Sequence, residues 1–394
     1  MRAFPSRVFL PFGLVAASIL MFGCGGASNS ASEPSQNGGN PVSNVVTITV
    51  NAGPDFNYVD GAFTSVTVCV PGSTTNCQTI DGILVDTGSF GLRILSSALT
   101  VSLPQQTNSG GSPIVECADF AGGFTWGPVE TADVKIAGEQ ASSLPIQVIG
   151  SPNFSTMSDN CSSPSMLLDD LASLGANGLL GVGQSVPDLQ EYFSCPSSGC
   201  SVTNEGLAQQ VQNPVASFAT DNNGVIVELP AVSGAEPSVS GSLIFGIGTQ
   251  SNNGLGGATV FGTDPFGNFN TTYQSTEYES FLDSGSNGIF FLDQNTTGLP
   301  LCADPDFYCP TSTQSISVVN NAETGTNGAS GPTSFTVGNG DLLLSNPNDT
   351  AINGLAGPQV GLFDFGLPFF FGRKVYTAID GKGTPGGTGP YSAY

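Results

Sequence analysis

Two ten-residue stretches of this chain, 197 residues apart, are near copies of each other. Residues 86–95 read DTGSFGLRIL and residues 283–292 read DSGSNGIFFL, so both follow the pattern D-[TS]-G-S-x-G-[LI]-x-[IF]-L. Apolar residues precede each aspartate, which predicts a buried strand that ends in a turn. One copy alone is typical of a surface turn. Two copies predict two related lobes that contribute one carboxylate each, Asp86 and Asp283, to a shared site.

A second and weaker repeat accompanies the first. Residues 177–183 read NGLLGVG and begin 91 residues after the first aspartate, while Phe365-Gly366 follows the second aspartate at a similar distance. The chain has 394 residues, 53 of them glycine, and its Val, Ile, Phe and Thr residues occur in short runs. This composition predicts two lobes of many short strands, an all-β and mostly antiparallel fold. Helical spacing is rare, and residues 164–174 are its clearest example.

Composition excludes several classes of function. The chain has no histidine, which excludes histidine-based nucleophile triads and histidine-ligated zinc. Its formal net charge of −24 makes nucleic acid a poor partner, because phosphate binding needs a basic surface. The acidity itself has two interpretations. We favour a soluble, self-repelling surface, and the alternative is adaptation to acidic conditions.

The N-terminus predicts export. Two arginines precede the short apolar stretch 8–22, so residues 1–23 resemble a signal peptide of the bacterial lipoprotein type, with Cys24 as the lipidated residue. The alternative is ordinary secretion with Cys24 inside the leader. Gly25 follows, which suits an outer-membrane destination. Residues 24–44 are rich in Gly, Ser and Asn and predict a flexible tether.

The remaining eight cysteines predict disulfide bonds. An even number in an exported chain is typical of a disulfide framework. Sequence proximity favours three short pairs and leaves one long pair, although spacing does not prove connectivity. Zinc is the alternative, and the absence of C-x-x-C pairs argues against it. The expected pairs are Cys69–Cys77, Cys195–Cys200, Cys302–Cys309 and Cys117–Cys161.

Paired aspartates define a specific chemistry. Two carboxylates in contact do not both ionise easily, so the pair holds one proton over a wide acidic range. The ionised partner can accept a proton from water while the neutral partner protonates a carbonyl oxygen. This chemistry needs no metal or other cofactor, and none is expected. The residues expected to support the dyad, by backbone approach or hydroxyl contact, are Thr87, Gly88, Ser89, Ser284, Gly285 and Ser286.

Together these motifs resemble those of pepsin-like, bilobal aspartic peptidases over most of residues 45–394. The resemblance implies an N-terminal lobe over 45–261, a C-terminal lobe over 262–394 and Asp86 and Asp283 as the catalytic pair. It also implies that a hairpin forms a flap over the site, with Phe120 where the family has a tyrosine. The residues of this expected flap are Phe120, Gly122, Gly123, Phe124 and Trp126.

Together with the N-terminal segment, the resemblance implies an exported, lipid-anchored aspartic endopeptidase that acts on peptides or unfolded proteins. We expect a monomer on the outer membrane of the cell envelope, held there by its lipid anchor alone. The chain also resembles an uncharacterised family of bacterial lipoproteins with the same motif pair. The alternatives are therefore a catalytically silent surface protein that binds extended peptides and a structural envelope lipoprotein. Facing carboxylates under a hairpin would favour the peptidase.

Overall fold

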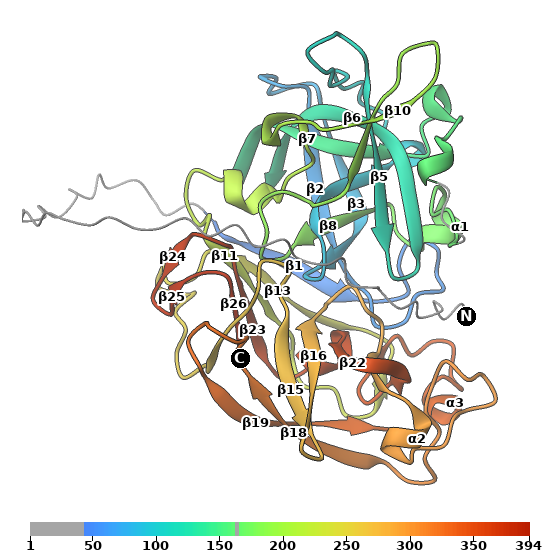
Figure 1. The fold of residues 1–394 in the computed structure, drawn as a ribbon, viewed down its shortest axis with the longest axis vertical. Helices are drawn as coiled ribbons and strands as arrows, with labels where there is room; N and C mark the ends of the chain where they lie inside the picture. Colours follow the sequence, from blue (N-terminus) through green and yellow to red (C-terminus); the bar gives the residue numbers. More distant parts are fainter. Residues whose placement is uncertain (1–42, 162–164) are drawn as a thin grey trace, which may run out of the picture.

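The computed structural model describes residues 43–161 and 165–394, and these consist mainly of β-strands. Figure 1 shows two lobes, with the lobe from the first half of the chain drawn above the other. A 15-stranded sheet runs through the first lobe and into the region between the lobes, and a seven-stranded sheet lies in the second lobe. The predicted all-β fold with two lobes is thus confirmed. The predicted signal peptide, Cys24 and nearly all of the tether lie outside the described residues.

Alternating sequences form strands of the large sheet. In VVTITV at residues 45–50, for example, every second side chain faces the core. In sheet order, its strands are β10 (Ser201–Thr203), β9 (Glu191–Ser194), β5 (Ile114–Phe120), β6 (Gly123–Ile136), β7 (Glu139–Ile149), β4 (Phe90–Leu95), β8 (Gly178–Val182), β3 (Cys77–Asp86), β2 (Ala62–Cys69), β1 (Val45–Val50), β13 (Val239–Phe245), β11 (Gly224–Glu228), β23 (Lys374–Ala378), β26 (Tyr391–Ala393) and β14 (Val260–Gly262).

The last six of these strands connect the lobes. β1 pairs with β13 along its whole length, and β11 pairs with β23, so segments about 150 to 200 residues apart lie side by side. In Figure 1 these strands lie between the upper and lower lobes. The chain enters this region at Asn44, whose backbone carbonyl accepts a 2.8 Å hydrogen bond from the Phe245 amide.

The second lobe is built on a smaller sheet and an aromatic core. The ring of Phe363 packs against the rings of Phe291 and Phe365, with ring centroids 5.4 and 5.7 Å apart, respectively. Such pairs bury large apolar areas and so stabilise the lobe. In sheet order, the strands are β19 (Ser330–Val337), β18 (Gln314–Asn321), β15 (Phe269–Tyr273), β16 (Thr276–Leu282), β22 (Gln359–Phe365), β17 (Ile289–Leu292) and β21 (Ala356–Gly357).

Two short strand pairs complete the β structure, and the helices are short. The pairs are β12 (Ala235–Glu236) with β20 (Ala351–Ile352), and β24 (Gly383–Thr384) with β25 (Gly387–Thr388). The helices are α1 (Leu171–Leu174), α2 (Gln294–Thr297), α3 (Gly340–Leu343) and the 3-10 turns η1 (Ser96–Ala98), η2 (Pro152–Phe154), η3 (Asp159–Cys161), η4 (Leu207–Gln209), η5 (Pro214–Ser217) and η6 (Leu367–Phe370).

The expected helix over residues 164–174 is only one turn long. It begins after Asp170, whose side chain accepts the Ser173 amide, and ends at Gly175 with φ 71°. Residues 165–170 are not helical, because the backbone of this segment pairs with the flap hairpin instead, and residue 164 lies outside the described residues. Phe124 donates to the Met166 carbonyl and accepts from the Leu168 amide.

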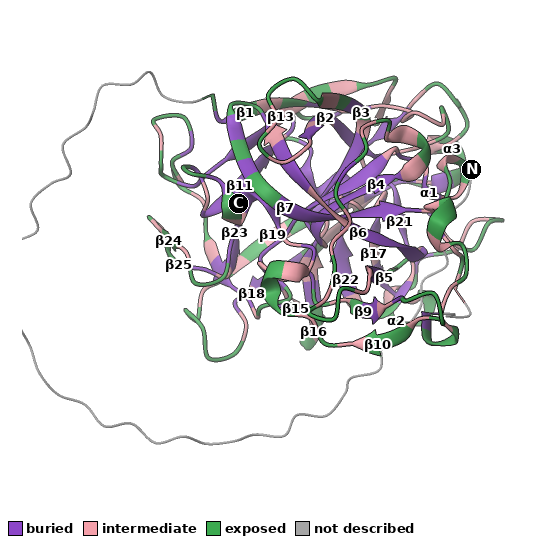
Figure 2. Cartoon of the chain, turned by 90° about the horizontal axis from the view of Figure 1, so that it is seen from above, coloured by how far each residue is buried: buried purple, intermediate pink, exposed green. Residues whose placement is uncertain are grey.

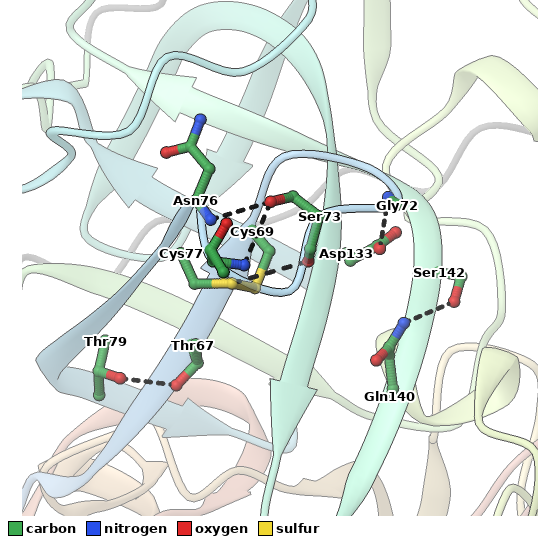
Figure 3. Close-up of a disulfide and its surroundings, with 11 residues drawn as sticks. Thr67, Cys69, Gly72, Ser73, Asn76, Cys77, Thr79, Asp133, Gln140 and Ser142 are labelled. Carbon is green, nitrogen blue, oxygen red and sulfur yellow. Dashed lines mark hydrogen bonds between the residues drawn. A yellow bond between two sulfur atoms is a disulfide. The ribbon is translucent and has the colours of Figure 1, made fainter.

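The four expected disulfides all form, as Cys69–Cys77, Cys117–Cys161, Cys195–Cys200 and Cys302–Cys309. The first closes the β2–β3 hairpin (Figure 3), where the Asn76 amide donates to the Ser73 hydroxyl at 2.9 Å. The second joins β5 to the segment after η2. Figure 2 shows the buried residues concentrated on the strands and the exposed ones on the connecting loops. Among residues 43–161 and 165–394, no helix has the length and apolar character needed to cross a membrane.

Candidate active site

The two aspartates occupy equivalent ends of buried strands. Asp86 is the last residue of β3, which runs parallel to β8, and it lies beside Gly181. Asp283 directly follows β16, which runs parallel to β22, and its amide donates to the Phe365 carbonyl. The apolar–Gly elements predicted as a second repeat therefore lie next to the aspartates in both lobes. Rigid buried strands carry both carboxylates to one place.

Reciprocal hydrogen bonds join the two loops. The Thr87 amide donates to the Ser284 hydroxyl at 3.1 Å, and the Ser284 amide donates to the Thr87 hydroxyl at 2.9 Å. Each hydroxyl also donates to a carbonyl of the opposite lobe, that of Leu282 for Thr87 and that of Val85 for Ser284. All four contacts are buried, so the loops have a fixed separation.

Each carboxylate has the same two local donors. The Gly88 amide donates to Asp86 Oδ1 at 2.8 Å and the Ser89 hydroxyl donates to Oδ2 at 2.6 Å. For Asp283, the corresponding donors are the Gly285 amide at 2.7 Å and the Ser286 hydroxyl at 3.0 Å. The residues expected to support the dyad therefore all lie against the aspartates or bridge their loops.

The carboxylates face the glycine of the opposite loop. A Cβ atom on Gly88 would lie 2.6 Å from the carboxyl carbon of Asp283, and one on Gly285 would lie 2.8 Å from that of Asp86. Both distances are too short for any side chain, so only glycine permits this approach. Burial raises the pKa of Asp283 well above its usual value, and the nearby Asp86 and Asp364 raise it further. The pair therefore tends to retain one proton.

A third carboxyl, that of Asp364, lies beside this pair, and the sequence did not lead us to expect it there. The Ser286 hydroxyl is 2.6 Å from Asp364 Oδ2, and Asp364 Oδ1 has no partner. Asp364 is 8% exposed, and its burial raises its pKa to about 8. One signal in the sequence could have identified Asp364. It is an acidic residue directly before Phe365-Gly366, at a position where the matching element of the first lobe has a leucine. The site thus contains a third acid whose burial favours its protonated form.

The hairpin predicted as the flap is formed by β5 and β6, with Phe120 paired to Gly123 across its tip. Gly123 has φ 159°, and its backbone approaches the Met166 carbonyl. Phe124 and Trp126 are buried rather than exposed at the tip, and the Trp126 indole donates to the Phe154 carbonyl at 2.8 Å. Of the predicted flap side chains, Phe120 is therefore the one that reaches beyond the hairpin, where it packs against the apolar cluster that includes Phe63, Leu84 and Leu168.

A cavity of about 310 Å³ is lined by residues of both lobes, and Asn287 of the second aspartate loop is among them. Tyr58 and Asn287 are part of its wall, and sequence reasoning missed both. Burial raises the pKa of the Tyr58 hydroxyl, with further contributions from Asp86 and Asp283, so this hydroxyl lies within electrostatic reach of both aspartates. The other lining side chains are mainly apolar and include Leu174, Phe307, Leu344 and Leu355.

The described residues include one group with the donor types of a metal site, formed by Cys302, Cys309 and Asp341. Its two cysteines are joined in a disulfide, so they do not supply thiolates to a metal. The chemistry of this group therefore does not fit a metal centre.

The fold is that of a pepsin-like aspartic proteinase. The crystal structure of an aspartic proteinase from Irpex lacteus is similar to this chain with a TM-score of 0.52 and 15% identity, over 89% of this chain and 96% of that one. By sequence, the chain belongs to the family described as a protein of unknown function, DUF3443, whose pattern matches residues 40–394. No curated protein matches the chain.

Proposed function

We propose that the protein is an exported, lipid-anchored aspartic endopeptidase that hydrolyses peptide bonds with Asp86, Asp283 and an activated water. The observation that carries this proposal is the face-to-face placement of the two carboxylates, fixed by the reciprocal Thr87 and Ser284 hydrogen bonds. A binding protein has no need for two acids at such short range, because one of them must stay protonated to avoid the repulsion of two buried charges. The similar proteinase structure supports the fold in which this chemistry would operate.

In the proposed reaction the pair holds one proton. The ionised carboxylate accepts a proton from water, and the resulting hydroxide oxygen bonds to the carbonyl carbon of the substrate. The neutral carboxyl gives its proton to the carbonyl oxygen, which forms a neutral tetrahedral diol. When the C–N bond breaks, the amine nitrogen takes up the proton that the first carboxylate gained from water, and one hydroxyl of the diol returns its proton to the second carboxylate. A carboxylic acid and an amine leave, and the pair again holds one proton. We assign the proton of the resting pair to Asp283, which shares the Ser286 hydroxyl with the third acid Asp364, and the role of base to Asp86.

The test uses full-length protein in detergent and an unfolded protein as substrate. We expect cleavage at acidic pH, inhibition by a statine-type peptide, and a loss of at least about 1000-fold in kcat for Asp86→Asn and Asp283→Asn. Asp341→Asn is the matched control, because Asp341 is an exposed aspartate outside the cleft. Cleavage that survives in both dyad variants would contradict the assignment. Tight statine binding without cleavage would instead support a peptide-binding protein.

Export and lipidation form a separate part of the proposal. Four disulfides are typical of an oxidising compartment outside the cytosol. We expect fatty-acid label to be incorporated into the wild-type protein and not into Cys24→Ala. The wild-type protein should be found in the outer-membrane fraction, and Cys24→Ala should be absent from it. Label retained in Cys24→Ala would show that this cysteine is not the anchor. A single chain supplies both aspartates, which supports a monomer.

A further inference from the structure

A buried ionic cluster lies beneath the flap. Its centre is Arg93, on β4, which is 1% exposed. The guanidinium donates through Nη2 to Glu116 at 2.5 Å and to Asp188 at 2.9 Å. Glu116 lies on β5, the first strand of the flap hairpin. A buried arginine with two carboxylates is costly to desolvate, so its presence needs a reason beyond packing.

The same guanidinium contacts the first aspartate loop and the flap tip. Its Nη1 donates to the carbonyl of Phe90, the residue that follows Ser89, at 2.7 Å. Its carbon atom Cζ lies 5.5 Å from the ring centroid of Phe120, within the range of a cation–π contact. Arg93 therefore touches both the loop that carries Asp86 and the side chain at the tip of the flap.

We propose that Arg93 is a positioning residue that holds the flap over the aspartates by binding the ring of Phe120, a role that rests on the proposed peptidase function. Phe120 has no hydroxyl, so it cannot be held by a hydrogen bond. A cation beneath its ring supplies an attraction that a phenyl group can use. The contact is desolvated on the arginine side, which strengthens it.

The rest of the cluster keeps the cation in place. The Tyr192 hydroxyl donates to Asp188 at 2.7 Å and accepts from the Val211 amide at 2.8 Å. Burial raises the pKa of Glu116, and the nearby Asp188 raises it further while Arg93 opposes the shift. Arg93 therefore lies between two acids that hold its guanidinium from two segments of the first lobe.

The equivalent position in the second lobe argues against a general structural requirement. Phe290 occupies that position on β17, seven residues after its aspartate, as Arg93 is seven residues after Asp86. The aspartate loop of the second lobe is thus built without a cation at this place. The first lobe differs in having the flap hairpin packed above it.

Hydrogen exchange of the full-length protein in detergent tests the proposal without any substrate. Phe120→Leu should increase exchange of the amides of residues 118–124 by about 10-fold, because it removes the ring over the cation. Phe120→Trp, which keeps a ring, should exchange like the wild type. Phe266→Leu is the matched control, since Phe266 is 59% exposed, and it should leave these amides unchanged.

Arg93→Met is a second variant, used only if its circular dichroism spectrum matches that of the wild type. It should increase hydrogen exchange of the flap amides as Phe120→Leu does. With a peptide substrate, Phe120→Leu should raise KM by about 10-fold with a smaller change in kcat. Unchanged flap exchange in Phe120→Leu would overturn the role of Arg93, whatever the activity. A wild-type protein that cuts no substrate would overturn the proposed function, while the exchange result would still decide the contact.

Discussion

Behind the first aspartate loop Arg93 lies opposite Leu179, on β8, whereas behind the second loop Phe290 lies opposite Asp364, on β22. The two pairs occupy matching places in the ladders β4–β8 and β17–β22. Each lobe therefore has one ionisable side chain at this pair of positions, a base in the first lobe and an acid in the second, on opposite strands. The backbone and the first donors to each carboxylate are shared, while the ionisable groups behind them differ. The two halves of the site thus share a geometry and not an electrostatic environment.

The largest expected effect concerns the acid of the second lobe. Because the folded-state pKa of Asp364 is raised to about 8, its contribution to stability is complete below the unfolded pKa near 4 and is lost as pH rises toward 8. The loss amounts to at most roughly 5 kcal/mol. Asp364→Leu, which copies Leu179, should reduce the difference in the free energy of unfolding between pH 4 and pH 8.

Urea unfolding at the two pH values measures that difference. Asp341→Asn should keep it, since Asp341 is exposed. Buried Asp60, Asp283 and Glu116 also have raised pKa values, so part of the pH dependence should remain in Asp364→Leu. An identical difference in wild type and Asp364→Leu would show that Asp364 does not distinguish the lobes.

The next effect tests the shared part of the geometry. Gly88→Ala and Gly285→Ala each place a methyl group against the opposite carboxyl, at 2.6 and 2.8 Å from its carbon. We expect each to lower kcat on a peptide by about 100-fold, because small displacements of reacting groups are that costly. Gly254→Ala, with open space around its Cβ, is the control. A large loss in one variant alone would break the symmetry of the loops.

A smaller effect is expected for the contacts that join the loops. Thr87→Val and Ser284→Ala each remove one hydroxyl and leave two buried backbone groups, one amide and one carbonyl, without their partner. Each should lower the free energy of unfolding by about 2 kcal/mol. Because the two hydroxyls share one network, the double variant should lose less than the sum. Fully additive losses in urea unfolding would mean that the contacts are independent.

The smallest effect concerns the cluster behind the first loop. Burial is the main cause of the raised pKa of Glu116, with Arg93 opposing it, so the protonated form is favoured in the folded state. Glu116→Gln copies that form and should match the wild type at pH 4. At pH 8 it should be more stable by about 1 kcal/mol, measured by thermal unfolding. Lower stability of Glu116→Gln at pH 8 would mean that an ionised Glu116 is needed beside Arg93.

The repeated loops, the bilobal β fold and the disulfides were predictable because each leaves a local pattern in the sequence. Asp364 and Arg93 were not, since a single charged residue within a strand does not reveal its partners. Arg93 meets Glu116 and Asp188, which are 23 and 95 residues away, and only the folded chain brings them together. The helix expected over residues 164–174 is short for the same reason, because Phe124 pairs with the backbone of that segment.

The strands between the lobes also affect the order in which the chain can fold. β11 pairs with β23, so the ladder between residues 224–228 and residues 374–378 can form only after the second segment has been made. During synthesis, more than a hundred further residues must emerge before this pairing is possible, and such long-range contacts form slowly. Until then β11 has an unpaired edge, which is a template for association with other chains. The ladder between the lobes is therefore expected to close late, after the C-terminal strands have been made.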